Sequence, residues 1–509
     1  MTRRMTPGMR GAGLTVALAL CVLPAALAQA QGELQGRNPP RERAPRAAPA
    51  MPTTAMPEGS IPLTLPEAVF LALRSNRAIR SQYLQRVSDR FSLRVTEASF
   101  DPRLNIAGGV TRTRIGNLNS TQTTLGPVVS IATPTGAQFQ FGWLGVQTNA
   151  RGANPNATGR ATFQVIQPLL AGGGLDFGMA PIRIARIQEA GSQLQLKSLV
   201  IDQVTQTIGG YRTLLQAQEQ LRISIEALRR ARELASVNQA LFAAGRLAQV
   251  ELIQAETSIA QQELSLAGAR NQHAAARLAL LTLLAVNQSQ MIWAVERPAA
   301  ESARVDPQRA MTIASANQPD YLRTLLTIEV SRINLDVARN QRLWDVSLVA
   351  GTGLASQRAE LARTLGALAE VRNDFNIGLQ VNIPLGQIAR EQPEVAATIG
   401  LRQAELAVEQ ARDRLRQQVE DTTRNIDTLR RQAELAKRAR ELAGLQLEAE
   451  LIKLQAGRSS NFQVVSFQGS LQSSESAELA AIIAYANALT QLDQVLGTTL
   501  DTWRISLND

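Results

Sequence analysis

Few side chains in this sequence are suited to catalysis or to metal binding. The chain contains one His, His273, and one Cys, Cys21. A zinc cluster needs several Cys or His ligands, and a Ser-His-Asp triad needs a His with suitable partners. We therefore expect no catalytic residue, no metal site and no cofactor. His273 has no potential partner near it in a predicted helix, so we interpret it as a packed or solvated side chain.

Three consecutive glycines, Gly172-Gly173-Gly174, follow a predicted strand and precede a predicted helix. Glycine-rich turns in this position bind phosphate in nucleotide-binding proteins. The run lacks the Lys-Ser/Thr pair of a P-loop and does not complete a G-x-G-x-x-G pattern. We therefore interpret it as a flexible turn between a strand and a helix.

The composition favours long helices over a compact enzyme. Of the 509 residues, 45% are apolar but only 4% are aromatic, whereas globular cores of this size use more aromatic side chains. The 53 Lys and Arg residues exceed the 43 Asp and Glu residues. The arginines alternate with Glu and Gln along predicted helices instead of forming one basic patch. This pattern favours a solvated helix surface and argues against nucleic-acid binding.

Residues 1–30 have the pattern of a secretory signal peptide. Three arginines precede an apolar run over residues 11–27, and an A-x-A cleavage pattern ends at Ala30. The run is too short to remain as a membrane helix. Cys21 lies inside it, and a lipoprotein interpretation would make Cys21 the lipidated residue. The bulky Leu20 that precedes Cys21 disfavours that interpretation.

The rest of the chain is predicted to contain two copies of one unit. A Pro- and Arg-rich segment over residues 31–60 is predicted to be a disordered linker. The first copy covers residues 61–300, the second covers residues 301–500, and residues 501–509 form a tail. Short sequence motifs recur in the second copy at a nearly constant distance from their counterparts in the first, which indicates this duplication.

Each copy begins with a helix. The Thr64–Glu67 segment forms a capping box, and Asp306-Pro307 provides an N-cap followed by a proline at the first helical position. These signals predict single helices over about 66–99 and about 307–341.

Each copy continues with alternating stretches, which predict strands within about 102–168 and about 344–385. The segment Gln138–Trp143 alternates polar and apolar residues as a membrane strand does, although an ordinary half-buried sheet is the alternative. We expect two strands per copy, and four strands cannot close a barrel that needs about eight. The chain is therefore expected to oligomerise. Residues 127–160 have no counterpart in the second copy, and either add a hairpin or form a surface loop.

Each copy ends with a long helical hairpin, over 181–286 and 393–497. The first helices, 181–244 and 393–456, each span roughly 96 Å at 1.5 Å per residue, which no globular core matches. An Ala-Gly-Arg sequence breaks each hairpin, and its glycines, Gly245 and Gly457, lie 212 residues apart. Return helices are predicted over about 248–285 and 461–496.

From Leu63 to about Leu500 the chain resembles the TolC-like outer-membrane efflux proteins. The segment Leu63–Ala68 is similar to the opening helix of that family, and Ala316–Leu322 is similar to its second-copy counterpart. The Pro168 and Pro384 segments match the junctions where a strand turns into a long helix. The order and spacing of these motifs carry the resemblance.

The resemblance implies a mainly α fold with transmembrane β strands. Three chains would form a twelve-stranded barrel in the lipid of a Gram-negative outer membrane, continued by a tube of twelve helices in the periplasm. Such a conduit is passive and works with a periplasmic adaptor and an inner-membrane transporter. Drug or metal efflux and type I protein secretion both remain open. A periplasmic coiled-coil scaffold or adaptor without a pore is the alternative, but it leaves the repeated strands unexplained.

The resemblance also suggests roles for residues at the helical tips. Adaptor contacts are expected at Gly245, Arg246, Gly457 and Arg458, although these glycines can also be simple helix terminators and the arginines simply solvated. Acidic residues narrow the periplasmic entrance in well-known relatives. The corresponding positions here are Glu251, Gln463 and Ser466, and only Glu251 is acidic. Glu251 is therefore either part of the closed entrance or a solvated helix residue.

Overall fold

The computed structural model describes residues 59–115, 118–150, 154, 156–296, 305–366, 372–383, 386, 388–456 and 458–507. These residues belong to one compact unit, Met56–Asp509. The predicted signal peptide with Cys21, nearly all of the predicted linker, and the predicted site residues Pro384 and Gly457 lie outside the described residues. Among the helices of the described residues, none has both the length and the apolarity that crossing a membrane requires.

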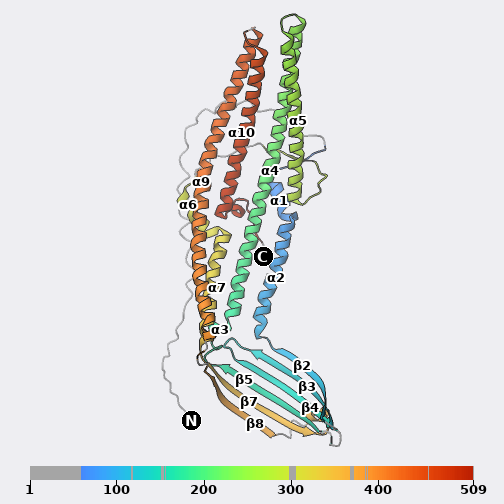
Figure 1. The fold of residues 1–509 in the computed structure, drawn as a ribbon, viewed down its shortest axis with the longest axis vertical. Coiled ribbons are helices and arrows are strands. Elements are labelled where there is room, and N and C mark those ends of the chain that lie inside the picture. The colour runs from blue at the N-terminus through green and yellow to red at the C-terminus, as the bar shows by residue number, and fades with distance from the viewer. Residues whose placement is uncertain are drawn as a thin grey trace, which may run out of the picture. The chain divides into compact units, whose positions relative to one another are not determined.

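Two long helical hairpins account for about half of the described chain (Figure 1). The first consists of α4 (Ala180–Ala243) and α5 (Gln249–Leu284), and the second of α9 (Gln392–Gln455) and α10 (Asn461–Leu496). The two first helices have 64 residues each, and the two return helices have 36 each. Neighbouring helices are in contact in the order α5, α4, α10, α9.

The predicted opening helices are each interrupted, so the expectation of single helices is wrong. The first is α1 (Leu65–Ser75) followed by α2 (Arg77–Glu97), and the second is α6 (Pro307–Asn317) followed by α7 (Pro319–Arg342). Asn76 leaves the helical conformation with ψ 127°, and its Oδ1 accepts a hydrogen bond from the Ala78 N–H at 2.8 Å. An Asn in this position caps the following helix instead of continuing the preceding one.

The remaining elements are short. They are the strands β1 (Ile61–Leu63) and β6 (Ile292–Ala294), which pair in parallel, the 3-10 helices η1 (Ala98–Phe100) and η2 (Ile388–Arg390), and the helices α3 (Leu175–Gly178), α8 (Leu361–Gly366) and α11 (Thr499–Thr502).

A six-stranded antiparallel sheet adjoins the helices, so the expected four strands per chain are an undercount. In spatial order it contains β2 (Arg103–Ile115), β3 (Leu118–Ala132), β4 (Gln138–Ala150), β5 (Asn156–Pro168), β7 (Asp345–Arg358) and β8 (Arg372–Asn382). The extra segment 127–160 therefore contributes strand instead of a surface loop. Most of it lies in β3, β4 and β5.

The two faces of this sheet differ in polarity. Residues directly opposite each other on neighbouring strands point to the same face. One cross-strand row on the first face contains Val129, Phe141, Phe163, Thr352 and Phe375. The adjacent row on the other face contains Ser130, Gln140, Gln164, Gly351 and Asn376. Phe141, Phe163 and Phe375 are largely exposed. The chain alone therefore presents an apolar face and a polar face, as the strands of a membrane barrel do.

The apolar cores lie along the helices, where the short elements cover them. Tyr211 of α4 is 1% exposed and packs in a cluster with Leu280 and Leu281 of α5. Its hydroxyl donates a hydrogen bond to the Leu63 carbonyl of β1 at 3.0 Å. A second cluster joins Leu415 and Val419 of α9 to α6 and α10. These clusters hold the hairpins together well away from their tips.

Candidate functional site

The turn of the first hairpin, between α4 and α5, is held by backbone hydrogen bonds. Helix α4 ends at Ala243, and Gly245 has the left-handed φ of +67°. The Arg246 N–H donates to the Leu241 carbonyl at 2.9 Å, and the Gly245 N–H donates to the Phe242 carbonyl at 2.9 Å. This backbone pattern satisfies the last carbonyls of the helix. Gly245 is therefore needed for the turn itself, and the Arg246 side chain is left exposed.

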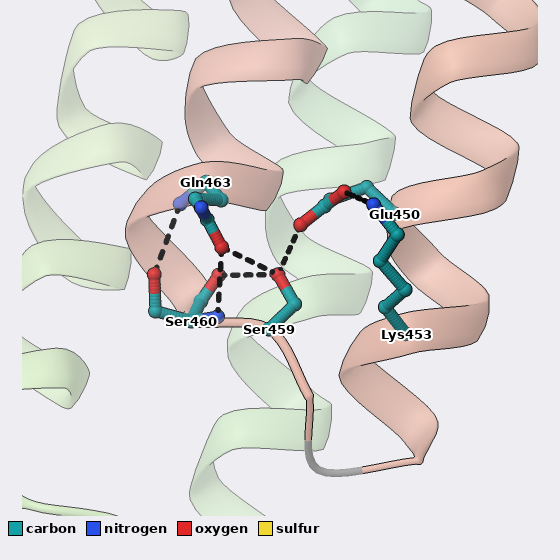
Figure 2. A network of polar contacts seen from close by, with 5 residues as sticks. All are labelled: Glu450, Lys453, Ser459, Ser460 and Gln463. Atoms are coloured by element: carbon teal, nitrogen blue, oxygen red, sulfur yellow. Dashed lines mark hydrogen bonds and ion pairs between the residues drawn. The ribbon is translucent and has the colours of Figure 1, made fainter.

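The turn of the second hairpin, between α9 and α10, is held by a network of side-chain hydrogen bonds (Figure 2). The Ser460 Oγ accepts from the Gln463 N–H at 3.4 Å, and the Gln463 Oε1 accepts from the Ser460 N–H at 3.4 Å, which makes a capping box. The Ser459 hydroxyl donates to Glu450 Oε1 at 2.5 Å and lies 3.1 Å from Gln463 Oε1. Lys453 Nζ lies 2.9 Å from Glu450 Oε2. The turn is thus tied to the last turns of α9.

Glu450 is the centre of this network. Its side chain is 7% exposed, so an unpaired carboxylate there would be costly. The hydrogen bonds from Ser459, and next from Lys453, lower the pKa of the Glu450 carboxyl below its usual value. The carboxylate form is therefore the one that the turn stabilises at neutral pH.

Contacts at the start of α10 join the two hairpins close to their tips. Asn461, the first residue of α10, is fully buried, and its Nδ2 donates to the Glu251 carbonyl of α5 at 3.2 Å. Val464 is also fully buried and packs with Leu234 of α4 and Leu447 of α9. The start of α10 is therefore held by both hairpins.

The structure places the predicted tip residues in different surroundings. Arg246 and Arg458 are exposed, whereas Gly457 lies outside the described residues. Glu251 is half-buried in the first turn of α5, and its backbone, not its side chain, makes the contact to Asn461. The remaining two gate candidates, Gln463 and Ser466, are exposed, and Gln463 is occupied as the capping residue of its own turn.

Three functional candidates of this region were not predicted from the sequence. Glu450, Ser459 and Asn461 carry the network and the contact between hairpins. The Ser460–Gln463 spacing is a capping signal that the sequence contains. The position of Glu450 has no such signal, because it lies in the preceding helix and meets Ser459 only through the fold of the turn.

The strand-to-helix junction lies at the other end of α4. Pro168 ends β5, and the next residue, Leu169, donates its N–H to the Val346 carbonyl of β7 at 2.8 Å. Asn340 of α7 accepts from the Gly172 N–H at 2.7 Å and donates to the Gly173 carbonyl at 3.0 Å. The first and second copies are therefore bonded to each other where the sheet meets the helices.

The three-glycine run forms this junction and has no helix suited to phosphate binding behind it. Gly172 and Gly174 have φ of +80° and +98°, and a Cβ on Gly173 would lie 2.5 Å from the Pro168 carbonyl oxygen. The following helix, α3, has only four residues. The glycines are required by the backbone path between β5 and α4.

His273 packs against an aromatic ring. Its centroid lies 5.5 Å from that of Trp293 in β6, and burial, followed by the positive charge of Arg277, lowers the pKa of the His273 ring. Within the described ranges there is no group of three or more His, Cys, Asp or Glu side chains that could hold a metal ion.

Comparisons with known proteins match most of this chain to one family model. The family model described as "Outer membrane efflux protein" matches residues 69–286 and 311–498. A comparison with curated proteins found no match.

Several solved structures have a similar fold. The chain is 18% identical to CusC, covering 85% of this chain and 92% of CusC, with a TM-score of 0.66. It is 14% identical to the outer membrane protein VceC from Vibrio cholerae, covering 85% of this chain and 96% of VceC, with a TM-score of 0.65. It is 15% identical to the CmeC outer membrane channel of Campylobacter jejuni, covering 90% of this chain and 94% of CmeC, with a TM-score of 0.65. At these identities the likeness concerns the fold.

The stability of the second turn is expected to depend on pH through Glu450. Replacing Glu450→Gln removes the charged acceptor of Ser459 and Lys453, so amide hydrogen exchange over residues 458–463 should become several-fold faster at neutral pH. Because the pKa of Glu450 is lowered, its contribution is present above the usual carboxyl pKa and is lost as the pH falls through the lowered value. The difference between variant and wild type should therefore shrink in acid.

Glu448→Gln is the matched control, because Glu448 is exposed on the same helix. Exchange mass spectrometry of both variants should show the faster exchange in Glu450→Gln alone. Equal exchange in the two variants at neutral pH would contradict the role of Glu450.

Proposed function

The chain belongs to the outer membrane efflux protein family, and we propose that it is a passive, trimeric channel of the outer membrane. The channel would lead from the periplasm to the exterior as part of a tripartite efflux or type I secretion system. A signal peptide over residues 1–30 would export it, and an inner-membrane transporter would supply the energy.

The observation that carries this proposal is the direct connection of a two-faced sheet to very long helices. The sheet has an apolar face and a polar face, and its strands β5 and β8 lead into α4 and α9 of 64 residues each. An apolar outer face suits lipid, and a polar inner face suits an aqueous passage. The long helices then extend the passage into the periplasm over roughly 96 Å.

Unpartnered surfaces of the single chain support the trimer. Six strands are fewer than the roughly eight that a membrane barrel needs. Helices α5 and α9 lie at the two ends of the row of long helices. On α9, exposed apolar residues recur at heptad spacing, at Leu435, Leu442, Leu445 and Ile452. Such a stripe is typical of a helix that packs against a further helix, and α5 of a second copy would cover it.

The equal lengths of the two hairpins support the internal duplication. Helices α4 and α9 start 212 residues apart, as do α5 and α10. Three chains with two similar hairpins each would form a tube of twelve helices. A coiled-coil scaffold would need the helices but not a sheet with one exposed apolar face, so we favour the channel.

Cell fractionation tests the proposal. We expect the protein in the outer-membrane fraction, released by detergent as a trimer, because its exposed apolar sheet face requires lipid. Native mass spectrometry or light scattering of the detergent extract measures the trimer. A soluble periplasmic protein would contradict the channel and favour the scaffold.

The exposed tips are the proposed docking surface for a periplasmic adaptor. Arg246 and Arg458, next to Gly245 and Gly457, occupy equivalent positions at the turns of the two hairpins. The double replacement Arg246→Glu and Arg458→Glu reverses two charges per chain and should weaken adaptor capture at least several-fold, because rim charges govern association.

The control for the tip variant is Arg416→Glu, an exposed arginine in the middle of α9. Co-purification of the adaptor and drug or protein export are measured alongside the trimer content. Unchanged capture and export in the double variant would contradict docking at the tips.

Glu251, with Gln463 and Ser466, is proposed to line the closed periplasmic entrance. Neutralising Glu251→Gln should reduce cation selectivity and block by divalent cations in single-channel recordings, because three carboxylates around one opening attract cations. Glu256→Gln, at an exposed position five residues further along α5, is the control. If both variants conduct like the wild type, Glu251 is a solvated helix residue.

A further inference from the structure

We propose that each chain contributes six membrane strands, so that three chains close a barrel of eighteen strands with a wider exit than a barrel of twelve. The extra strands are the β3–β4 hairpin. This inference rests on the proposed function, because closing the barrel requires three chains in the outer membrane.

The hairpin is paired along nearly its whole length, with one interruption between β3 and β4 at Gly126 and Pro127. Strand β3 pairs with β2 from Arg103↔Ser130 to Ile115↔Leu118 and with β4 from Ala132↔Gln138 to Ser120↔Ala150. Strand β4 pairs in turn with β5. Strands of 13 and 15 residues exceed the roughly 9–11 that a membrane strand needs. The hairpin is therefore long enough to cross the membrane twice.

The hairpin also continues the two faces of the sheet. Leu125 and Val129 of β3 and Phe139 and Phe141 of β4 lie on the apolar face, and the Phe139 ring lies 6.5 Å from that of Phe163 in β5. Thr124 of β3 and Gln140 of β4 belong to the polar face. A loop over the channel mouth has no reason to keep this alternation, whereas a strand between lipid and water must keep it.

The turn of the hairpin is built into the strand-to-helix junction. The Thr135 carbonyl accepts from the Gly174 N–H at 3.1 Å and from Gln167 Nε2 at 3.2 Å. Gly136 has φ of +87°, and a Cβ there would lie 2.3 Å from the Gly172 carbonyl oxygen. These contacts place the β3–β4 turn at the helical end of the sheet, which is the periplasmic side of the proposed channel.

The edges of the sheet are oriented to close the barrel. Strand β2 leads away from the helices, and β8 leads back to α9. Strand β8 of one chain would therefore run antiparallel to β2 of the next, which is the same pairing as inside each chain. The apolar face continues to both edges, at Leu104 and Ile106 of β2 and at Ile377 and Leu379 of β8.

The strand number sets the width of the exit. Barrel diameter grows roughly linearly with strand number, and barrels of 16–18 strands hold an open aqueous channel. At about 4.8 Å between strands and about 40° of tilt, eighteen strands give a backbone diameter of roughly 36 Å, against roughly 24 Å for twelve. The barrel would pass cargo of larger cross-section, and the helical tips would limit passage.

The position of the β3–β4 turn can be tested by labelling. In a Cys21→Ser background, single cysteines are placed at Thr135 in the turn, at Glu360 in the β7–β8 connection and at Arg246 at the helical tip. All three residues are exposed. The probe is a maleimide attached to a bulky polyethylene glycol that crosses neither the membrane nor the channel. It is added to intact cells, and to cells with a permeabilised outer membrane.

Thr135→Cys should behave like Arg246→Cys and react only in permeabilised cells, whereas Glu360→Cys should react in intact cells. Thr133→Cys, in the same turn, is the second variant if Thr135→Cys is not assembled. Reaction of both turn and Glu360 cysteines in intact cells would overturn the six-strand inference and leave the channel in place. Failure of Glu360→Cys to react in intact cells, with reaction after permeabilisation, would overturn the channel and the strand count together.

Discussion

Hydrogen bonding at the edges of the sheet constrains this molecule more than any other interaction. Inside hydrocarbon every backbone N–H and C=O needs a protein partner, so a membrane sheet cannot keep an open edge. Within the described residues, no strand pairs with the outer sides of β2 and β8. In the proposed channel their partners would be strands from further copies of the chain. The same closure would bring α9 beside α5 of a neighbour, where the exposed heptad stripe of α9 requires cover.

The stability of the long helices depends on apolar packing instead of on closure of the sheet. Their apolar clusters lie where β1, β6, α1 and α6 cover them, and the cluster near the tips is small. Fully buried Asn461 and Val464 hold the start of α10 against both hairpins. Local stability therefore falls from the covered middle of the helices towards the turns, because fewer apolar contacts oppose local opening there. Lower local stability at the turns would suit the proposed channel, whose periplasmic end lies there.

The sequence predicted the long elements better than the places where they join. Periodic stretches without internal proline, each ended by one Ala-Gly-Arg break, predicted the long helices to within a residue or two, because helix periodicity is a strong signal over 64 residues. The count of strands was wrong, since β3 is rich in Ser and Thr and alternates weakly. The helix break at Asn76 was missed because a capping Asn resembles a surface helix residue. The buried role of Glu450 depends on a partner nine residues away, beyond a turn, which no local pattern reveals.

The two turns are held by different interactions although their helices have equal lengths. The second is cross-linked through Glu450, Ser459 and Gln463, whereas the first relies on backbone hydrogen bonds around Gly245. In a ring of three chains, rigid and compliant turns would alternate. The helical tube would then have approximate six-fold symmetry in its backbone but only three-fold symmetry in its mechanical response. A partner that contacts all six turns with equal force would displace the three first-hairpin turns before the three second-hairpin turns. It could therefore distinguish the two kinds of turn by how easily each is displaced.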